Sequence, residues 1–291
     1  ILVHPNGGQY FEIIVLHSAK AIATTNDGKI FLRVGDQCHA ARSEDLVRIA
    51  TEKDAFQWEL QPRNISIADI SFQNISWFAN EIRQSPRVKE SIKQLTDAEI
   101  AEHYNLTING QLSNLGVLWL GNAQQRSRLA YPLTVQYIVY NDLEEKVRKI
   151  DWHDYSLNPK ELLQEIENQA IELTYYHEFK DGLFQRKPIR FYHEKVIREL
   201  LINAFAHKSY TISGDIFIKV YVDRIEVKNP GGLLMGISKD NILHKTARRN
   251  PHLIKVFHDL NLMEGEGSGY DLMYELNSRN AKPFPVVEAD Y

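Results

Sequence analysis

The sequence contains only one cysteine, Cys38, in 291 residues. A single cysteine excludes an internal disulfide framework and every zinc or iron–sulfur site that needs several cysteines. The sequence also lacks a run of about 18 apolar residues, the length that a membrane-spanning helix requires, and its first residues carry no basic leader. We therefore expect a cytoplasmic protein with no membrane partner.

The sequence has no excess of positive charge. Its 34 lysine and arginine residues are outnumbered by 38 aspartate and glutamate residues, which gives a net charge of −4. Contact with nucleic acid would therefore need a local basic patch. The 43% of apolar and 25% of charged residues are typical of a globular protein, and the length predicts about two domains. Because the chain starts without methionine and stops soon after Phe284, we expect a fragment of a longer protein.

Several catalytic signatures are missing. The P-loop pattern G-x-x-x-x-G-K-[ST] does not occur, because the pair Gly28-Lys29 is followed by Ile30 and lacks the upstream glycine. Neither the H-E-x-x-H of zinc proteases nor the G-x-S-x-G of serine hydrolases is present. The missing P-loop excludes a P-loop motor for this chain, and the sequence carries no signature of either class of hydrolase.

The first 70 residues have the pattern of a small α+β domain followed by a boundary. Two apolar stretches predict strands at 10–16 and 30–34, and the Asn-Asp-Gly sequence at 26–28 predicts a turn. Ser43 and the acidic residues behind it predict a short helix over 43–49. The apolar residues lose their regular spacing over 58–70, and we expect the domain boundary in this segment.

The middle of the chain carries clear cap signals and apolar runs. They predict a helix behind the capping box Thr96–Glu99, an apolar element at 112–120, a strand at 133–140, and a helix that begins with Asn158, Pro159 and Glu161. A further helix is predicted behind Asn250 and Pro251, which have the residue types of a cap and a first helical position.

Residues 194–206 are strongly helical and carry a polar stripe. Glu199, Asn203 and His207 are spaced by four residues, so they lie along one side of the helix. The other sides are apolar, which predicts a largely buried helix. A polar stripe on a buried helix needs hydrogen-bond partners within the core or a ligand, and the spacing alone leaves both interpretations open.

Two glycine-rich segments follow this helix. Apolar and polar residues alternate over 215–222 and 224–228, which predicts an antiparallel hairpin. The hairpin leads into Asn229-Pro230-Gly231-Gly232. Later, Gly265, Gly267 and Gly269 precede a helical stretch at 270–276. Glycines let the backbone approach a ligand closely, and free amides at a helix start attract an anion. An ordinary tight turn and a connector are the alternatives.

The order and spacing of these segments resemble the ATP-binding domain of the GHKL superfamily, which includes gyrase, histidine kinases and MutL. More closely, the sequences Arg198–His207, 229–232, 249–251 and 265–269 are similar to bacterial Schlafen/AlbA-like transcriptional regulators. The segments 112–121 and 28–35 are similar to upstream parts of the same proteins. Relatives of this kind sometimes carry the label of a RecG-like helicase, although this chain lacks the P-loop motif of a helicase motor domain.

The resemblance implies an α+β fold in three parts. Residues 1–58 would be the C-terminal part of an AlbA/Schlafen-like DNA-binding domain, and residues 59–155 a middle α+β region. Residues 156–291 would be a GHKL-type ATP-binding domain, an α/β sandwich with a mixed sheet and helices on one face.

The resemblance also assigns roles to residues of the C-terminal part. Asn203 would bind Mg²⁺ and Glu199 would polarise the attacking water as the catalytic residue. The glycines Gly265, Gly267 and Gly269 would hold phosphate, and Lys245 or Arg249 would offset its charge or lie in a solvated basic loop. The remaining nucleotide-binding residues would be His207, Asn229, Gly231 and Gly232.

One position departs from the superfamily pattern. Asn229 stands where an aspartate usually accepts a hydrogen bond from the adenine amino group, and an asparagine oxygen accepts the same bond without the charge. The resemblance thus implies a regulator that binds ATP and Mg²⁺ with slow or no hydrolysis. It also implies DNA as a partner, through residues 1–58 and a winged helix beyond this chain, and it allows a homo-oligomer. The alternative is a degenerate GHKL scaffold without nucleotide that serves dimerisation or protein interaction.

Overall fold

The computed structural model describes residues 2–3, 9–10, 22, 24–34, 37–42, 45–46, 49, 57–180, 186–234, 237, 241–242, 247–263, 269–280 and 282–289. The chain forms two compact units, residues 1–56 and 57–291. No described helix has both the length and the apolar character that a membrane crossing requires.

The first unit contains two short hairpins. Strands β1 (Leu2–Val3) and β2 (Gln9–Tyr10) pair with each other, as do β3 (Phe31–Val34) and β4 (Gln37–Ala40). Strand β3 confirms the strand predicted at 30–34, and the turn at 26–28 is present, with Gly28 at φ +77°. Most of the strand predicted at 10–16 and part of the helix predicted at 43–49 lie outside the described residues.

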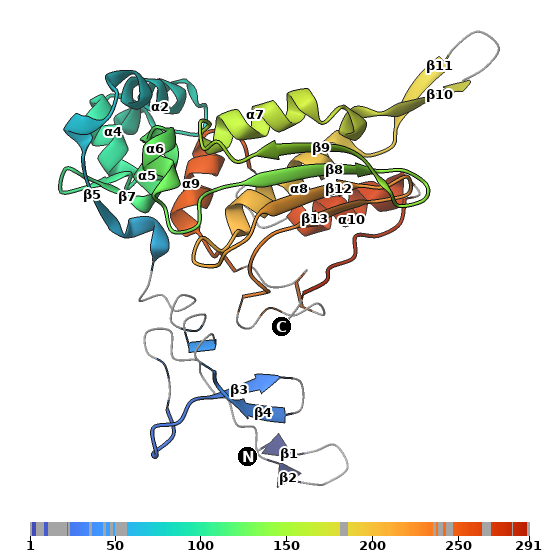
Figure 1. Cartoon of the computed structure of the whole chain (residues 1–291), viewed down its shortest axis with the longest axis horizontal. Helices are drawn as coiled ribbons and strands as arrows, with labels where there is room; N and C mark the ends of the chain where they lie inside the picture. Colours follow the sequence, from blue (N-terminus) through green and yellow to red (C-terminus); the bar gives the residue numbers. More distant parts are fainter. Residues whose placement is uncertain are drawn as a thin grey trace. The chain divides into compact units, whose positions relative to one another are not determined.

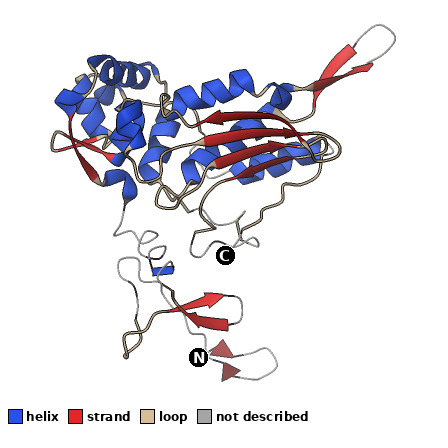
Figure 2. Cartoon of the chain, viewed as in Figure 1, coloured by secondary structure: helices blue, strands red, loops and turns tan. Residues whose placement is uncertain are grey.

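The second unit begins with a mainly helical part, shown with its helices in blue in Figure 2. Its elements are η1 (Trp58–Leu60), β5 (Pro62–Ser66), η2 (Ile67–Asp69), α2 (Phe72–Gln84), α3 (Glu90–Lys93), α4 (Asp97–His103), β6 (Thr107–Ile108), β7 (Gln111–Ser113), α5 (Asn114–Leu120) and α6 (Ala123–Ser127). The capping box predicted at Thr96 and Glu99 is formed. The apolar run at 112–120 is divided, because the Ser113 side chain caps α5 through the Gly116 amide.

The rest of the unit is built around a four-stranded sheet. Its elements are β8 (Val135–Tyr140), β9 (Lys146–Trp152), α7 (Pro159–Gln169), η3 (Ile171–Thr174), β10 (Tyr176–Lys180), β11 (Arg186–Arg190), α8 (Glu194–His207), β12 (Ile216–Val220), β13 (Ile225–Lys228), α9 (Pro251–Asp259) and α10 (Gly269–Arg279). The strand order is β13-β12-β8-β9, with β12 parallel to β8 and the other pairs antiparallel.

Helices α8 and α10 lie on the same side of this mixed sheet (Figure 1). In β12, Ile216, Ile218 and Val220 are buried, whereas the residues between them are partly exposed. This alternation is what a sheet with one covered face requires. The predicted α+β fold class is therefore confirmed, as are the predicted helices that begin at Asn158 and at residue 194.

One hydrophobic core joins the helical part to the sheet part. Helix α9 contributes to both, because Phe257 packs edge-on against Trp119 of α5 with ring centroids 5.8 Å apart. Trp58 of η1 stacks on Tyr210, which follows α8, at 4.5 Å. The elements of the sheet part are thus held in place by the preceding helices.

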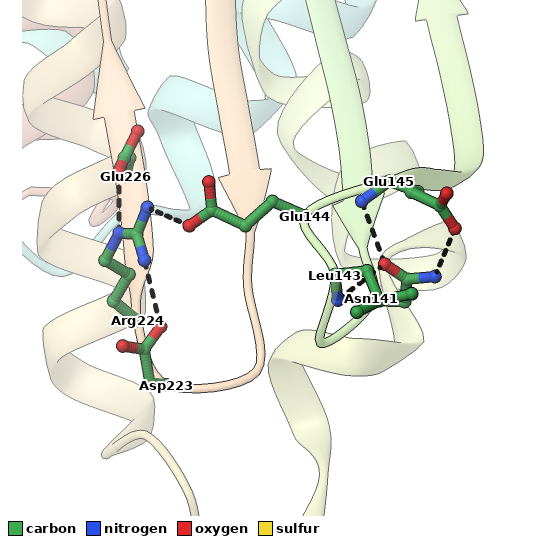
Figure 3. Close-up of polar contacts among 7 residues, drawn as sticks. All are labelled: Asn141, Leu143, Glu144, Glu145, Asp223, Arg224 and Glu226. Carbon is green, nitrogen blue, oxygen red and sulfur yellow. Dashed lines mark hydrogen bonds and ion pairs between the residues drawn. The ribbon is translucent and has the colours of Figure 1, made fainter.

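The turns at one end of the sheet are tied together by polar contacts (Figure 3). Arg224, between β12 and β13, forms ion pairs with Asp223, Glu226 and Glu144, the last of which lies in the β8–β9 turn. Asn141 closes that turn by accepting from the backbone amides of residues 143 and 145. These groups are largely exposed, so they define the loop geometry and contribute little stability.

Candidate functional site

Helix α8 carries the predicted polar stripe at the centre of the sheet part. Its apolar residues Val196, Leu201 and Phe205 are buried, as the sequence pattern predicts. On the stripe, Glu199 is only 7% exposed, and Asn203 and His207 are partly exposed. A carboxylate buried to this degree needs partners.

The first of those partners is Asn203. The Asn203 side-chain amide donates over 3.1 Å to Oε1 of Glu199, which lies one turn earlier on α8. The same carboxylate lies against Gly269, the first residue of α10. A Cβ at position 269 would overlap Glu199 Oε1 and would lie 2.6 Å from its Cδ. Only glycine therefore allows the helix start and the carboxylate to approach this closely.

The glycine turn after β13 lies at the other end of the stripe. Gly231 has φ +100°, a conformation that favours glycine. A Cβ there would overlap the Arg249 guanidinium and lie 2.9 Å from Ser209 Cβ. The Ser209 amide donates to Pro230 O over 3.0 Å. This turn is therefore packed directly against the chain that leaves α8.

Asn229 and Arg249 connect the turn to α8. Asn229 Nδ2 donates to Ala204 O over 3.2 Å. The Asn229 side-chain oxygen is its only acceptor atom, and this bond fixes the amide so that the oxygen can still accept from a ligand. Arg249 donates to His207 O over 3.2 Å and to Gly232 O over 2.7 Å. An aspartate at position 229 could not donate to Ala204 O, so this hydrogen bond requires the asparagine.

Electrostatics around the end of α8 disfavour additional positive charge. Burial, together with the nearby Arg249 and Arg248 guanidinium groups, lowers the pKa of His207 to about 4, so its imidazole is neutral at pH 7. Lys208 is fully buried, and burial lowers its pKa to about 8. Its ammonium group lies 4.9 Å from the centre of the Tyr210 ring.

Two residues near the site have roles that the sequence pattern did not indicate. Asn250 occupies the cap position of α9, as predicted, but its side chain forms no cap hydrogen bond and donates instead to Ala206 O and Lys208 O, both over 2.8 Å. The α9 cap is supplied by Glu59 of η1, whose Oε1 accepts from the Leu253 amide over 2.5 Å. No local pattern links residues 59 and 253, so only the fold reveals this pair.

The structure thus places the described site residues in two neighbouring groups along one side of α8. Glu199, Asn203 and Gly269 form one group, and His207, Asn229, Gly231, Gly232 and Arg249 form the other. Asn203 and His207 are one helical turn apart, about 6 Å along the axis. Lys245, Gly265 and Gly267 lie outside the described residues.

The donor set of the first group fits a magnesium ion. Asn203 uses its nitrogen on Glu199, so its oxygen is the atom that can bind a cation. Mg²⁺ is commonly bound through one or two carboxylates together with water and substrate phosphates, and the carboxylate of this group is that of Glu199. Among the described residues, no group of three or more His, Cys, Asp or Glu side chains could hold a metal ion. A metal ion held by this group would therefore also need oxygen atoms from a bound small molecule, such as phosphate oxygens.

Comparison with known proteins relates the last part of the chain to one family. Residues 214–291 match one family model. Its description is "Putative ATP-dependent DNA helicase recG C-terminal", and the matched segment begins just before β12 and extends past α10, so it does not include α8. The match supports a nucleotide-binding role for this segment. No curated protein matches the sequence.

A solved structure has a similar fold. The chain resembles the DIP2311 protein of Corynebacterium diphtheriae with a TM-score of 0.64 and 20% sequence identity. The similarity covers 91% of this chain but only 51% of that one, so the chain spans about half the length of the similar protein. At this identity, the likeness concerns the fold alone.

Proposed function

We propose that the C-terminal part of this chain binds an adenine nucleotide together with Mg²⁺, in the manner of a GHKL-type domain. The observation that carries the proposal is the contact of the Glu199–Asn203 pair with the first residue of α10, in a unit whose residues 214–291 match an ATP-related family. The wider role that we propose is a cytoplasmic transcriptional regulator of the Schlafen/AlbA-like kind, with DNA as a partner of residues 1–58.

Each residue of the site has a defined task in this proposal. Asn203 Oδ1 ligates the metal, and the backbone amides at the start of α10 face the phosphates. Asn229 Oδ1 accepts from the base, and the glycine turn lets the base approach the backbone. When bound, Mg²⁺ supplies charge neutralisation for the phosphates. If hydrolysis occurs, Glu199 accepts the proton of the attacking water, and we expect turnover to be slow.

A scaffold without nucleotide is the second candidate, and one observation favours it. The Arg249 guanidinium packs on Gly231 and bonds to Gly232 O, so a side chain of the protein itself covers part of the glycine turn. In that case the turn would have a purely structural role, and the domain would serve dimerisation or protein interaction.

Replacing the proposed metal ligand separates the two candidates. We expect Asn203→Ala to weaken binding of a non-hydrolysable ATP analogue at least 10-fold in the presence of Mg²⁺, because the cation loses its protein amide ligand. Isothermal titration calorimetry of the full chain measures this change. Asn64→Ala, at an exposed position of β5, is the control and should leave the affinity unchanged. Equal affinities for wild type and Asn203→Ala would contradict the assignment of the metal site.

A further inference from the structure

A cleft in the helical part of the second unit is separate from the proposed nucleotide site. Residues of α2, α5, α6 and α7 line it, and its volume is about 280 Å³. The residues that matter for its chemistry are Trp77, Trp119, Ala123, Arg126 and Glu161. Because a water molecule takes about 30 Å³ of the liquid, this space corresponds to roughly nine waters. The cleft therefore suits a small metabolite.

Arg126 gives the cleft a buried positive charge. Its side chain is 6% exposed, and its described hydrogen bonds all go to backbone carbonyls, those of Leu118, Trp119, Tyr155 and Ser156. The bond from Nη2 to Trp119 O is long, at 3.5 Å, and the second N–H of Nη2 has no acceptor in the described part of the chain. A buried charge without an opposite partner is costly. Arg126 thus retains a donor for an anionic group.

Glu161 brings a negative charge to the same cleft. Its Oε2 accepts from the Asn158 amide over 2.8 Å in the capping box of α7, whereas no hydrogen bond of the described residues uses Oε1. Burial lowers the pKa of Arg126 to about 10, and the nearby Glu161 carboxylate opposes this shift. The described structure nevertheless contains no ion pair between the two side chains. Two opposite charges therefore line one cleft without direct contact.

Two tryptophans add aromatic surface to the walls. Trp77 is partly exposed. Trp119 is buried, and its indole N–H has no acceptor in the described structure, although buried donors in proteins are nearly always paired. Aromatic walls with a few polar groups among them are typical of a ligand site.

We propose that this cleft binds a free amino acid with an apolar side chain. The carboxylate of the ligand accepts from Arg126, its ammonium group donates to Glu161 Oε1, and its side chain packs on Trp77. An amino acid carries both charges on one carbon atom, so it can bridge two opposite charges within a small space. A purely anionic or purely cationic ligand would leave one of the two residues without a partner. No described residue of the proposed nucleotide site lines the cleft, so this ligand is additional to the nucleotide.

Calorimetric titration of the full chain with leucine, methionine and phenylalanine tests the proposal. For the amino acid that binds most tightly, the deaminated acid and the decarboxylated amine are titrated as well; for leucine these are isocaproate and isoamylamine. We expect each of the two truncated molecules to bind at least about 10-fold more weakly than the amino acid, because each leaves a charged group of the cleft unpaired.

Glu161→Gln tests the proposed ammonium contact. Glutamine also serves in a capping box, so the start of α7 is retained while the charge is removed. We expect the amino acid to bind this variant at least about 10-fold more weakly than wild type, and the deaminated acid to bind both proteins equally. Glu167→Gln, at an exposed position of the same helix, is the control and should bind the amino acid as wild type does.

Ala123→Phe tests the location, because a larger side chain at the first position of α6 fills the cleft. This variant should not bind the amino acid, and melting curves establish that every variant is folded. The proposal is wrong if none of the three amino acids binds folded wild type at millimolar concentration, or if the deaminated acid binds as tightly as the amino acid. Unchanged binding in Glu161→Gln or in Ala123→Phe would likewise overturn it.

Discussion

Gly116→Ala should destabilise the protein by about 3 kcal/mol or more, although helix propensity alone predicts the opposite sign. Gly116 lies inside α5, where alanine is usually favoured over glycine by about 1 kcal/mol. A Cβ at this position would overlap Leu106 O and would lie 2.8 Å from Leu106 C. Because both atoms belong to the backbone of Leu106, which is fully buried, the helix and this residue must move apart.

Chemical denaturation measures the free energy of unfolding of Gly116→Ala against wild type. Gln124→Ala, at an exposed position of α6, is the control and should change stability by less than about 0.5 kcal/mol. A Gly116→Ala protein as stable as wild type, or more stable, would show that α5 and residue 106 are not packed as described.

Glu59→Gln should gain stability over wild type as the pH rises. The difference in free energy of unfolding between the variant and wild type should be about 3 kcal/mol more favourable to the variant at pH 8 than at pH 4.5. Glu59 is 2% exposed, and burial raises its pKa from 4.5 to about 7 despite the hydrogen bond from Leu253. Between pH 4.5 and about 7, Glu59 keeps its proton in the folded protein and releases it in the unfolded chain. The folded state therefore binds more protons, and its stability falls as the pH rises through this window.

Glutamine has no charge to lose, so the Glu59→Gln protein escapes this loss. Any constant effect of the substitution on packing cancels in the comparison of the two pH values. The neutral His207, which titrates in the opposite sense, is present in both proteins and cancels as well. Glu102→Gln, at an exposed position of α4, should match wild type at both pH values. A pH-independent difference between Glu59→Gln and wild type would mean that Glu59 is not buried against α9.

Local signals were sufficient to predict several helices of the second unit. The capping boxes at Thr96 and Asn158 are formed, and the periodic apolar residues of α8 are buried. These features depend on residues three or four positions apart, so they can be recognised from the sequence alone. The polar stripe on α8 was visible for the same reason.

The partners of that stripe depend on contacts between distant segments. The approach of Glu199 to Gly269 spans 70 positions, and no periodic pattern measures such a distance. The pairing of β8 with β12 and the capping of α9 by Glu59 have the same character. Asn250 was predicted as a cap from its residue type, yet α8 offers it two carbonyls that end the helix, and its side chain bonds there.

The location of the nucleotide is the central claim of this account, and nuclear magnetic resonance of a glycine-labelled protein tests it most directly. The chain has 15 glycines, which give a small set of amide signals. When a non-hydrolysable ATP analogue is added with Mg²⁺, we expect the assigned signals of Gly231, Gly232 and Gly269 to shift. Those of Gly110 and Gly116, in the helical part, should stay in place. Signals that all remain unchanged, or that shift only at Gly110 and Gly116, would contradict the claim.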